Sequence, residues 1–185
     1  LIDHLDSETS YIRDIASPTT LVRSGSEFKI NTSNTFNTAD IWRAPVTVLA
    51  DDSFVVTWEA VESVGSFNSG IFAQIYDASG IKSSNEFQIS TFAADGPSIS
   101  MSSPSTAALL DGGFVVTWTL GGQKGAVLGV HGQRYDASGV AVGPEFEVKS
   151  AEGNAQDSRW VSVFTDRGCV VNWGSDLAGG CRGIG

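Results

Sequence analysis

Basic residues are scarce in this chain of 185 residues. Eleven lysines and arginines stand against 21 aspartates and glutamates, which gives a net charge of −10. Such an acidic surface repels phosphate backbones and anionic lipid headgroups. The sequence also lacks an apolar run long enough for a membrane-spanning helix, and residues 1–10 lack the basic and apolar segments of a signal peptide, although a cleaved signal would leave no trace. We therefore expect neither a nucleic-acid partner nor membrane insertion.

Residues that commonly carry catalysis or bind metals are few. The only histidines are His4 and His131, and the only cysteines are Cys169 and Cys181. Their spacing matches neither a nucleophile with its base nor a zinc site, and the known calcium-loop motifs are absent. We expect no enzyme and no cofactor, with calcium binding left open. A polysaccharide hydrolase stays an alternative, because carboxylates that are paired by folding leave no spacing signal.

An internal repeat of 59 residues organises the sequence. The pair Glu-Phe occurs at residues 27–28, 86–87 and 145–146, so both steps are 59 residues long. Within these periods, DDSFVVTW at 51–58 matches DGGFVVTW at 111–118. Repeats of this length are typical of stacked or circular arrays of small structural units.

A second motif, Tyr-Asp-Ala-Ser-Gly, occurs at residues 76–80 and again at 135–139. Its aspartate suits the first position of a type I turn, and its glycine suits the fourth. A catalytic cluster would normally occur once, whereas this one recurs at equivalent places. We therefore interpret the motif as a corner in the chain. A looser third copy, DRGCVVNW at residues 166–173, is not followed by this motif.

The repeat divides the chain into four parts. They are an N-terminal extension (1–24), a first copy (25–83), a second copy (84–142), and an incomplete third copy with a glycine-rich tail (143–185).

The pattern within each copy is that of β-strands. Alternation in the second copy places Phe114, Val116 and Trp118 on one face and Val115 and Thr117 on the other. With an aspartate-glycine hairpin before this strand, each copy is expected to form four antiparallel strands, beginning with the Glu-Phe strand.

The predicted fold is therefore all-β, with tandem four-stranded repeats arranged as β-propeller-like blades; an open β-sandwich or a solenoid is the alternative. The tryptophans at equivalent positions, Trp58, Trp118 and Trp173, would fill the layers between sheets. The N-terminal extension could then supply a strand that the third copy lacks.

The segments DGGFVVTW, GQRYDASG and VGPEFEV resemble a repeat of very large bacterial secreted and surface proteins, often those that also carry repeats-in-toxin calcium-binding arrays. The resemblance covers about residues 25–173 and is closest in the second copy. It implies an extracellular, non-enzymatic, modular protein used for adhesion, display or matrix building. The chain departs from that family in its few copies and in Cys169, which stands where the other copies have phenylalanine.

Four residues outside the repeated pattern are candidates for special roles. Trp42 and Trp160 have no aromatic counterpart at residue 101, so they either stack on a sugar or cap the end of a strand pair. Cys169 and Cys181 either form a disulfide that fixes the glycine-rich tail or remain free thiols. His131 occupies the position of Phe72 in the first copy and is expected to be a packed strand residue.

These observations favour an extracellular structural or adhesive module that acts with other protein chains or further repeats in a larger assembly. The alternative with a binding function is a carbohydrate-binding module of propeller type.

Overall fold

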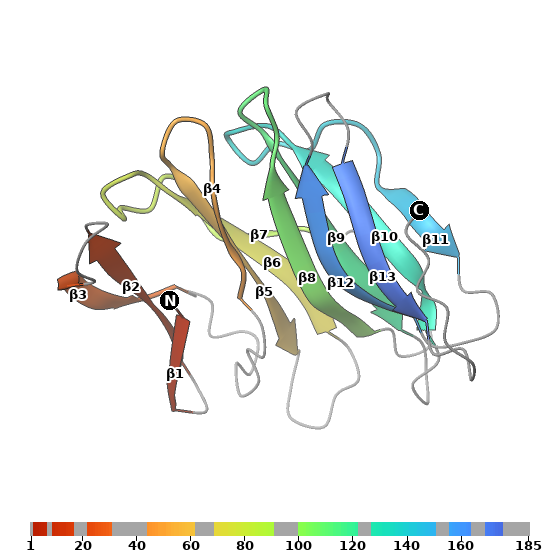
Figure 1. Ribbon diagram of the computed structural model, residues 1–185, viewed down its shortest axis with the longest axis horizontal. Coiled ribbons are helices and arrows are strands. Elements are labelled where there is room, and N and C mark those ends of the chain that lie inside the picture. The colour runs from red at the N-terminus through yellow and green to blue at the C-terminus, as the bar shows by residue number, and fades with distance from the viewer. Residues whose placement is uncertain are drawn as a thin grey trace.

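The computed structural model shows an all-β chain (Figure 1). The structure describes residues 2–6, 9–16, 22–30, 44–61, 69–90, 100–121, 127–150, 156–163 and 169–175. Its strands are β1 (Ile2–Asp6), β2 (Thr9–Ala16), β3 (Val22–Lys29), β4 (Val46–Val48), β5 (Phe54–Val61), β6 (Ser69–Tyr76), β7 (Phe87–Gln88), β8 (Ser100–Ala108), β9 (Phe114–Gly121), β10 (Val127–Tyr135), β11 (Phe146–Ser150), β12 (Gln156–Val163) and β13 (Cys169–Ser175). None of the described residues belongs to a helix that could cross a membrane.

Two four-stranded antiparallel sheets form the centre of the molecule. The first central sheet has the strand order β4-β5-β6-β7, and the second has the order β8-β9-β10-β11. Strands β1, β2 and β3 form a separate N-terminal sheet, and β12 pairs with β13 in a hairpin. Consecutive strands pair throughout, as the short connections in the sequence favour. The all-β prediction is confirmed.

The Glu-Phe strands do not join the sheets that the sequence predicted. Strand β7 pairs with β6, with Phe87 opposite Ala73, and β11 pairs with β10, with Phe146 opposite Gly132. The connection from β6 to β7 is short, so the chain folds back along the strand it has just left. Each central sheet therefore contains three strands of one sequence copy and the first strand of the next.

The N-terminal residues also differ from expectation. Strands β1 and β2 pair with each other and with β3, which carries the first Glu-Phe pair. Among the described residues, neither strand joins β12 or β13. The idea that residues 1–24 complete the third copy is therefore wrong, because β3 provides a nearer edge for β2 to pair with.

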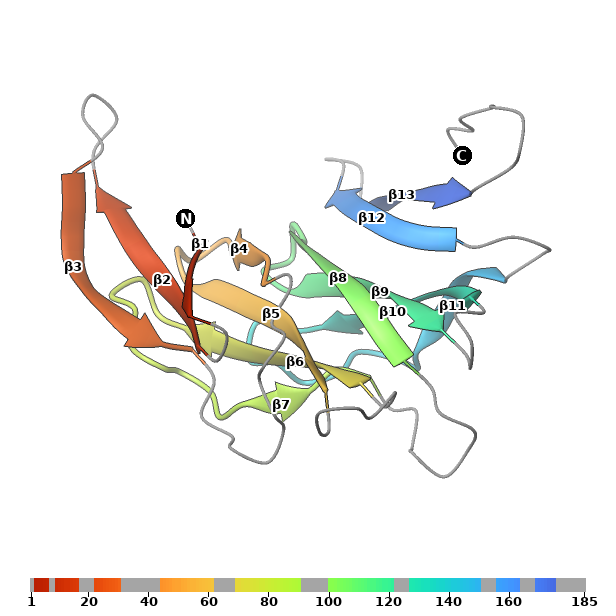
Figure 2. The ribbon, with the colours of Figure 1, turned by 90° about the horizontal axis from the view of Figure 1, so that it is seen from below.

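The four sheets are stacked face to face along an arc. In Figure 2 the N-terminal sheet lies at the left, the central sheets follow, and the β12–β13 hairpin lies at the right. Phe28 and Ile30 of the N-terminal part pack on the first central sheet, and β12 lies against β8, β9 and β10. Stacking hides both faces of each central sheet, which explains why their strands are buried almost throughout.

The core between the two central sheets confirms the predicted alternation. Phe114, Val116 and Trp118 of β9 pack against residues of the first sheet such as Ile75, while Val115 belongs to a separate cluster on the opposite face. Trp118 is fully buried in this layer.

The preceding layer repeats this arrangement. Trp58 packs with Ile30 and Phe72 between the N-terminal sheet and the first central sheet. Two of the three tryptophans expected between sheets are thus confirmed there, whereas the side chain of Trp173 lies outside the described residues.

Hydroxyl groups link the two central sheets as well. The Thr57 and Thr106 hydroxyl oxygens are 2.8 Å apart, and the Thr47 hydroxyl donates to the carbonyl of Thr106 at 3.0 Å. The Ser69 hydroxyl accepts from the backbone N–H of Met101 at 2.7 Å. These bonds fix how one sheet sits on the other, because hydrogen bonds are directional and apolar contacts are not.

Candidate functional site

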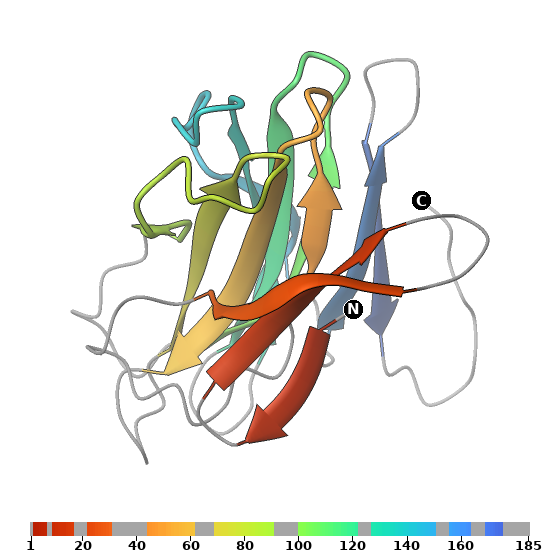
Figure 3. The same ribbon diagram turned by 90° about the vertical axis from the view of Figure 1, so that its left-hand side faces the viewer.

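One end of the two central sheets consists of four neighbouring turns. We call residues 49–53, 77–84, 109–113 and 136–143 the turn end. Because strands alternate in direction, both the turn after the first strand and the loop after the third strand of each sheet lie at this end (Figures 1 and 3). The turn end contains most of the polar letters that the sequence repeats.

Each hairpin turn is held by its own backbone. In the second sheet the Leu109 N–H donates to the Gly113 carbonyl at 2.8 Å, and the Gly112 N–H donates to the Leu109 carbonyl at 3.1 Å. Gly112 adopts φ = 87°, and Asp52 adopts φ = 65° in the equivalent turn of the first sheet. These are three-residue hairpin turns that end in a left-handed residue, a conformation that aspartate tolerates better than most residues.

The Tyr-Asp-Ala-Ser-Gly loops are the corners that the sequence predicted. The Asp136 carboxylate accepts from the backbone N–H groups of Ser138 and Val140, each at 2.9 Å. Asp77 accepts from the backbone N–H groups of Ser79 and Ile81 in the same way. The Ser138 hydroxyl and the backbone donors hold the pKa of Asp136 below its usual value. The carboxylate therefore stabilises the loop and stays ionised at neutral pH.

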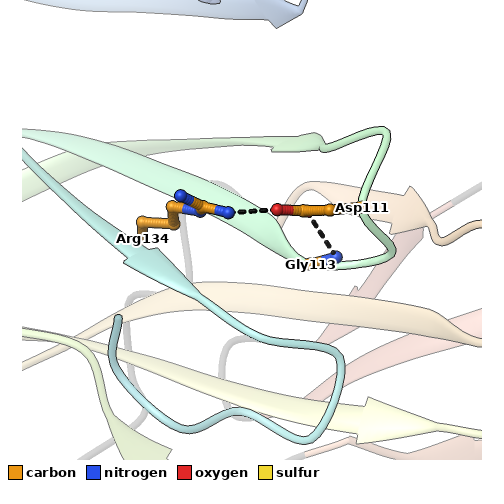
Figure 4. A network of polar contacts seen from close by, with 3 residues as sticks. All are labelled: Asp111, Gly113 and Arg134. Atoms are coloured by element: carbon orange, nitrogen blue, oxygen red, sulfur yellow. Dashed lines mark hydrogen bonds and ion pairs between the residues drawn. The ribbon is translucent and has the colours of Figure 1, made fainter. Parts of the chain in front are cut away.

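The second sheet adds an ion pair that the first sheet lacks. The Arg134 guanidinium of β10 binds the Asp111 carboxylate in the β8–β9 turn, and the Gly113 N–H donates to the same carboxylate at 3.2 Å (Figure 4). The Gly113 N–H, followed by the charge of Arg134, lowers the pKa of Asp111. In the first copy Ile75 stands at the position of Arg134, so this contact could not be read from the repeat.

The tyrosines of the repeated motif connect one sheet to the preceding one. The Tyr135 hydroxyl donates to the Ile89 carbonyl at 2.8 Å, and the Tyr76 hydroxyl donates to the Ile30 carbonyl at 3.1 Å. Both pairs are separated by 46 residues in the sequence. Burial raises the pKa of both hydroxyls well above the usual value, so neither is poised for acid–base chemistry.

The loop glycines lie over the preceding sheet. A Cβ atom at Gly139 would be 3.0 Å from Cζ of Phe87, and one at Gly80 would be 3.7 Å from Cε1 of Phe28. Both glycines have positive φ, 86° and 78° respectively. The loop after each third strand therefore reaches across the edge of its neighbour and makes the turn end continuous from sheet to sheet.

His131 is a packed strand residue, as predicted. Its ring lies 6.5 Å from that of Trp118, and its Nδ1 is 3.3 Å from Oε1 of Glu145. The equivalent Phe72 packs on Trp58 with the same centroid separation of 6.5 Å. The histidine thus fills an aromatic position in the layer between sheets.

The structure leaves the special roles of the four other candidates as predictions. Trp42 and Cys181 lie outside the described residues, as do the side chains of Trp160 and Cys169. In the backbone, Trp160 lies opposite Asn172, just as Ser105 lies opposite Thr117. Trp160 therefore corresponds to Ser105 in strand register and not to residue 101, because irregular pairing in β8 and β12 offsets a simple count.

A group of residues that the sequence argument overlooked stands out at the turn end. Four large apolar side chains there are between 41% and 65% exposed: Ile81, Leu110, Val140 and Val142. The available signal was an aliphatic residue placed among turn-forming residues, as in SGI, LLDGG and SGVAV. Such side chains are costly to expose in a group and mark interaction surfaces.

Neither a metal centre nor a relative is evident. Within the ranges that the structure describes, no three histidine, cysteine, aspartate or glutamate side chains come together to hold a metal ion. No protein-family model matches the chain, and no curated protein matches it. The turn end is thus the candidate site on the strength of its own residues.

Proposed function

We propose that the chain is a non-enzymatic structural or adhesive module, built from tandem blades of β-propeller type, that acts outside the cell within a larger assembly. The carrying observation is the bond from Tyr135 to Ile89 together with its counterpart from Tyr76 to Ile30. Each joins a sheet to the one before it in the same way. A contact that recurs with the repeat propagates a stack, as in propellers and solenoids.

The repeated polar residues support a scaffold over an enzyme, because each already has a structural bond. Asp136 closes its loop, Tyr135 binds the preceding sheet, and the Gln133 side chain donates to the Gly143 carbonyl at 3.1 Å. Gln74 makes the equivalent bond to the Ser84 carbonyl at 2.9 Å. These residue types could serve catalysis elsewhere, but here their hydrogen-bonding capacity serves the fold.

An exposed apolar flank supports action within an assembly. Val46 and Val48 of β4 are 39% and 61% exposed. Their counterparts in the second sheet, Thr106 and Ala108, lie opposite Val116 and Phe114 and face the first central sheet. A strand flank that is covered in one sheet and bare in the other is a surface for further repeats or other chains. The resemblance to bacterial secreted and surface repeats supports the extracellular location.

Sedimentation velocity over a wide concentration range tests the assembly. The wild-type chain should form larger species as its concentration rises, and Val46→Lys/Val48→Lys should suppress them, since lysine on a strand flank opposes association. The matched control, Ile81→Lys, adds charge at the turn end and should leave the association unchanged. A single monomeric species at every concentration would argue against the proposal.

A glycan array and a polysaccharide-hydrolysis screen test the alternatives. A scaffold should show neither saturable sugar binding nor turnover. Sugar binding that disappears in Trp42→Ala or Trp160→Ala would replace the proposal with a carbohydrate-binding module. Hydrolysis abolished by substitution of a carboxylate pair would replace it with a hydrolase.

A further inference from the structure

The exposed apolar residues of the turn end are dispensable for the core. Ile81, Leu110, Val140 and Val142 belong to none of the core clusters of the described residues. Their backbone positions are nevertheless fixed: the Val140 carbonyl accepts from the Asp136 N–H at 2.9 Å, and the Val142 N–H donates to the Arg134 carbonyl at 2.8 Å. Side chains held out by an ordered backbone lose little conformational entropy when a partner binds.

Carboxylates surround these apolar side chains. The turn end contains the five acids Asp51, Asp52, Asp77, Asp111 and Asp136, but only one base, Lys82. Arg134, at the end of β10, is already paired with Asp111. A partner that docks on this surface therefore meets an excess of negative charge around an apolar centre.

The surface spans both central sheets. Gly139 packs against Phe87 of the first sheet, which brings the loop with Val140 and Val142 over the edge of that sheet. The Asp111–Arg134 pair ties the hairpin turn of Leu110 to the strand that leads into the same loop (Figure 4). In Figures 1 and 3 the loops of both sheets project on the same side.

The chemistry of this surface excludes several other occupants. Nucleic acids and anionic lipids would be repelled by the carboxylates. Sugar recognition favours aromatic platforms, whereas the exposed residues at the turn end are aliphatic. Oδ1 of Asp77 and Oδ1 of Asp136 already accept backbone N–H bonds, so these carboxylates are committed to their own loops.

We propose that the turn end is the docking surface for a protein partner that presents lysine or arginine side chains around an apolar centre. The apolar contact supplies affinity, and the charges supply orientation and rapid association. This inference rests on the proposed function, since it names the partner class of the same assembly module.

Binding of a dye-labelled synthetic peptide of alternating lysine and leucine, measured by fluorescence anisotropy on the full chain, tests the proposal. Saturable binding is expected, with a Kd that rises with salt. Peptides of alternating glutamate and leucine, or of alternating lysine and serine, should bind much more weakly. Equal binding of all three peptides, or no binding of the lysine and leucine peptide, would overturn the proposal.

Matched variants locate the binding. Leu110→Ser/Val140→Ser should weaken the peptide by about tenfold, which corresponds to about 1.4 kcal/mol. Asp52→Asn removes a charge while keeping a residue that tolerates a left-handed backbone, and it should weaken binding and reduce its salt dependence. Val46→Ser on β4 and Glu147→Gln on β11 are the controls and should bind as wild type. Binding that responds equally to the controls would contradict the proposal.

The two proposals fail in different ways. Self-association that is lost in Val46→Lys/Val48→Lys, together with absent peptide binding, would leave the module intact and refute the turn-end partner. Absent self-association together with peptide binding confined to the turn end would do the reverse.

Discussion

The hydroxyl of Tyr135 in one sheet donates a 2.8 Å hydrogen bond to the backbone carbonyl of Ile89, which follows the outermost strand of the preceding sheet. Both groups are buried, and Phe114 stacks on the tyrosine ring with a centroid separation of 5.2 Å. The bond lies at the outer edge of the layer between sheets. It therefore secures the strand that each sheet takes from the next sequence copy.

Replacing this hydroxyl tests its contribution. Tyr135→Phe should lower the free energy of unfolding by about 1 to 3 kcal/mol, because the Ile89 carbonyl loses its donor while staying buried. Urea denaturation followed by tryptophan fluorescence measures the change. Ser79→Ala at an exposed loop position is the control and should be near neutral. Equal stability of Tyr135→Phe and wild type would refute a structural role for the bond.

The loop glycines permit a matched comparison. Gly139 and Gly143 both have positive φ, 86° and 77°, but only Gly139 lies against the preceding sheet, whereas a Cβ at Gly143 meets nothing within 4 Å. Gly143→Ala should cost about 1 to 2 kcal/mol from backbone strain alone. Gly139→Ala should cost about 1 to 3 kcal/mol more, because the methyl group crowds Phe87. Thermal or urea unfolding of the two variants checks this, and equal losses would contradict the proposed contact between sheets.

The threonine bridge between the central sheets should behave as a coupled pair. Thr57→Val and Thr106→Val each break the 2.8 Å contact between their hydroxyls. The double variant should be more stable than the sum of the single losses implies, by about 0.5 to 1.5 kcal/mol. A double-mutant cycle in urea measures this coupling. Strict additivity would show that the two hydroxyls do not stabilise each other.

Acid should weaken the turn end. Hydrogen bonds from Ser53, Gly113 and Ser138 hold the pKa values of Asp51, Asp111 and Asp136 below the ordinary 3.8. Because these pKa values are lowered in the folded state, their stabilising contribution is present above pH 3.8 and is lost as the pH falls through the folded values.

Unfolding measured over this pH range checks the acid prediction. Asp136→Asn removes the titrating group and should lose less stability than wild type in acid. Ser138→Ala removes the largest cause of the lowered pKa and should also flatten the pH dependence. Parallel acid profiles for wild type and both variants would contradict the assignment.

Local sequence chemistry predicted the strands and corners of the central sheets well. The alternation in FVVTW appears as β5 and β9, and the aspartate and glycine of YDASG adopt the expected turn. Such features depend on residues close in the sequence, so their side chains specify them directly.

Pairing between segments was harder to predict. The assignment of β7 and β11 to the preceding sheets depends on which edge is free and near, which no local pattern encodes. Strand β8 runs through Pro104 because the pairing is irregular between Ser102 and Ser105, so a residue that normally argues against a strand is tolerated. The turn-end surface was missed for a related reason: exposure of Leu110 and Val140 follows from the stacking of sheets and not from their immediate neighbours.

The sharing of strands between sequence copies has a consequence for how such a chain can change in length. Because β7 completes a sheet whose other strands come from the copy before it, a cut after residue 83 would separate β6 from its partner. Gain or loss of a whole 59-residue period would instead exchange one Glu-Phe strand for its equivalent and leave every sheet complete. Recombination between periods could thus lengthen or shorten the array in steps without an intermediate that misfolds.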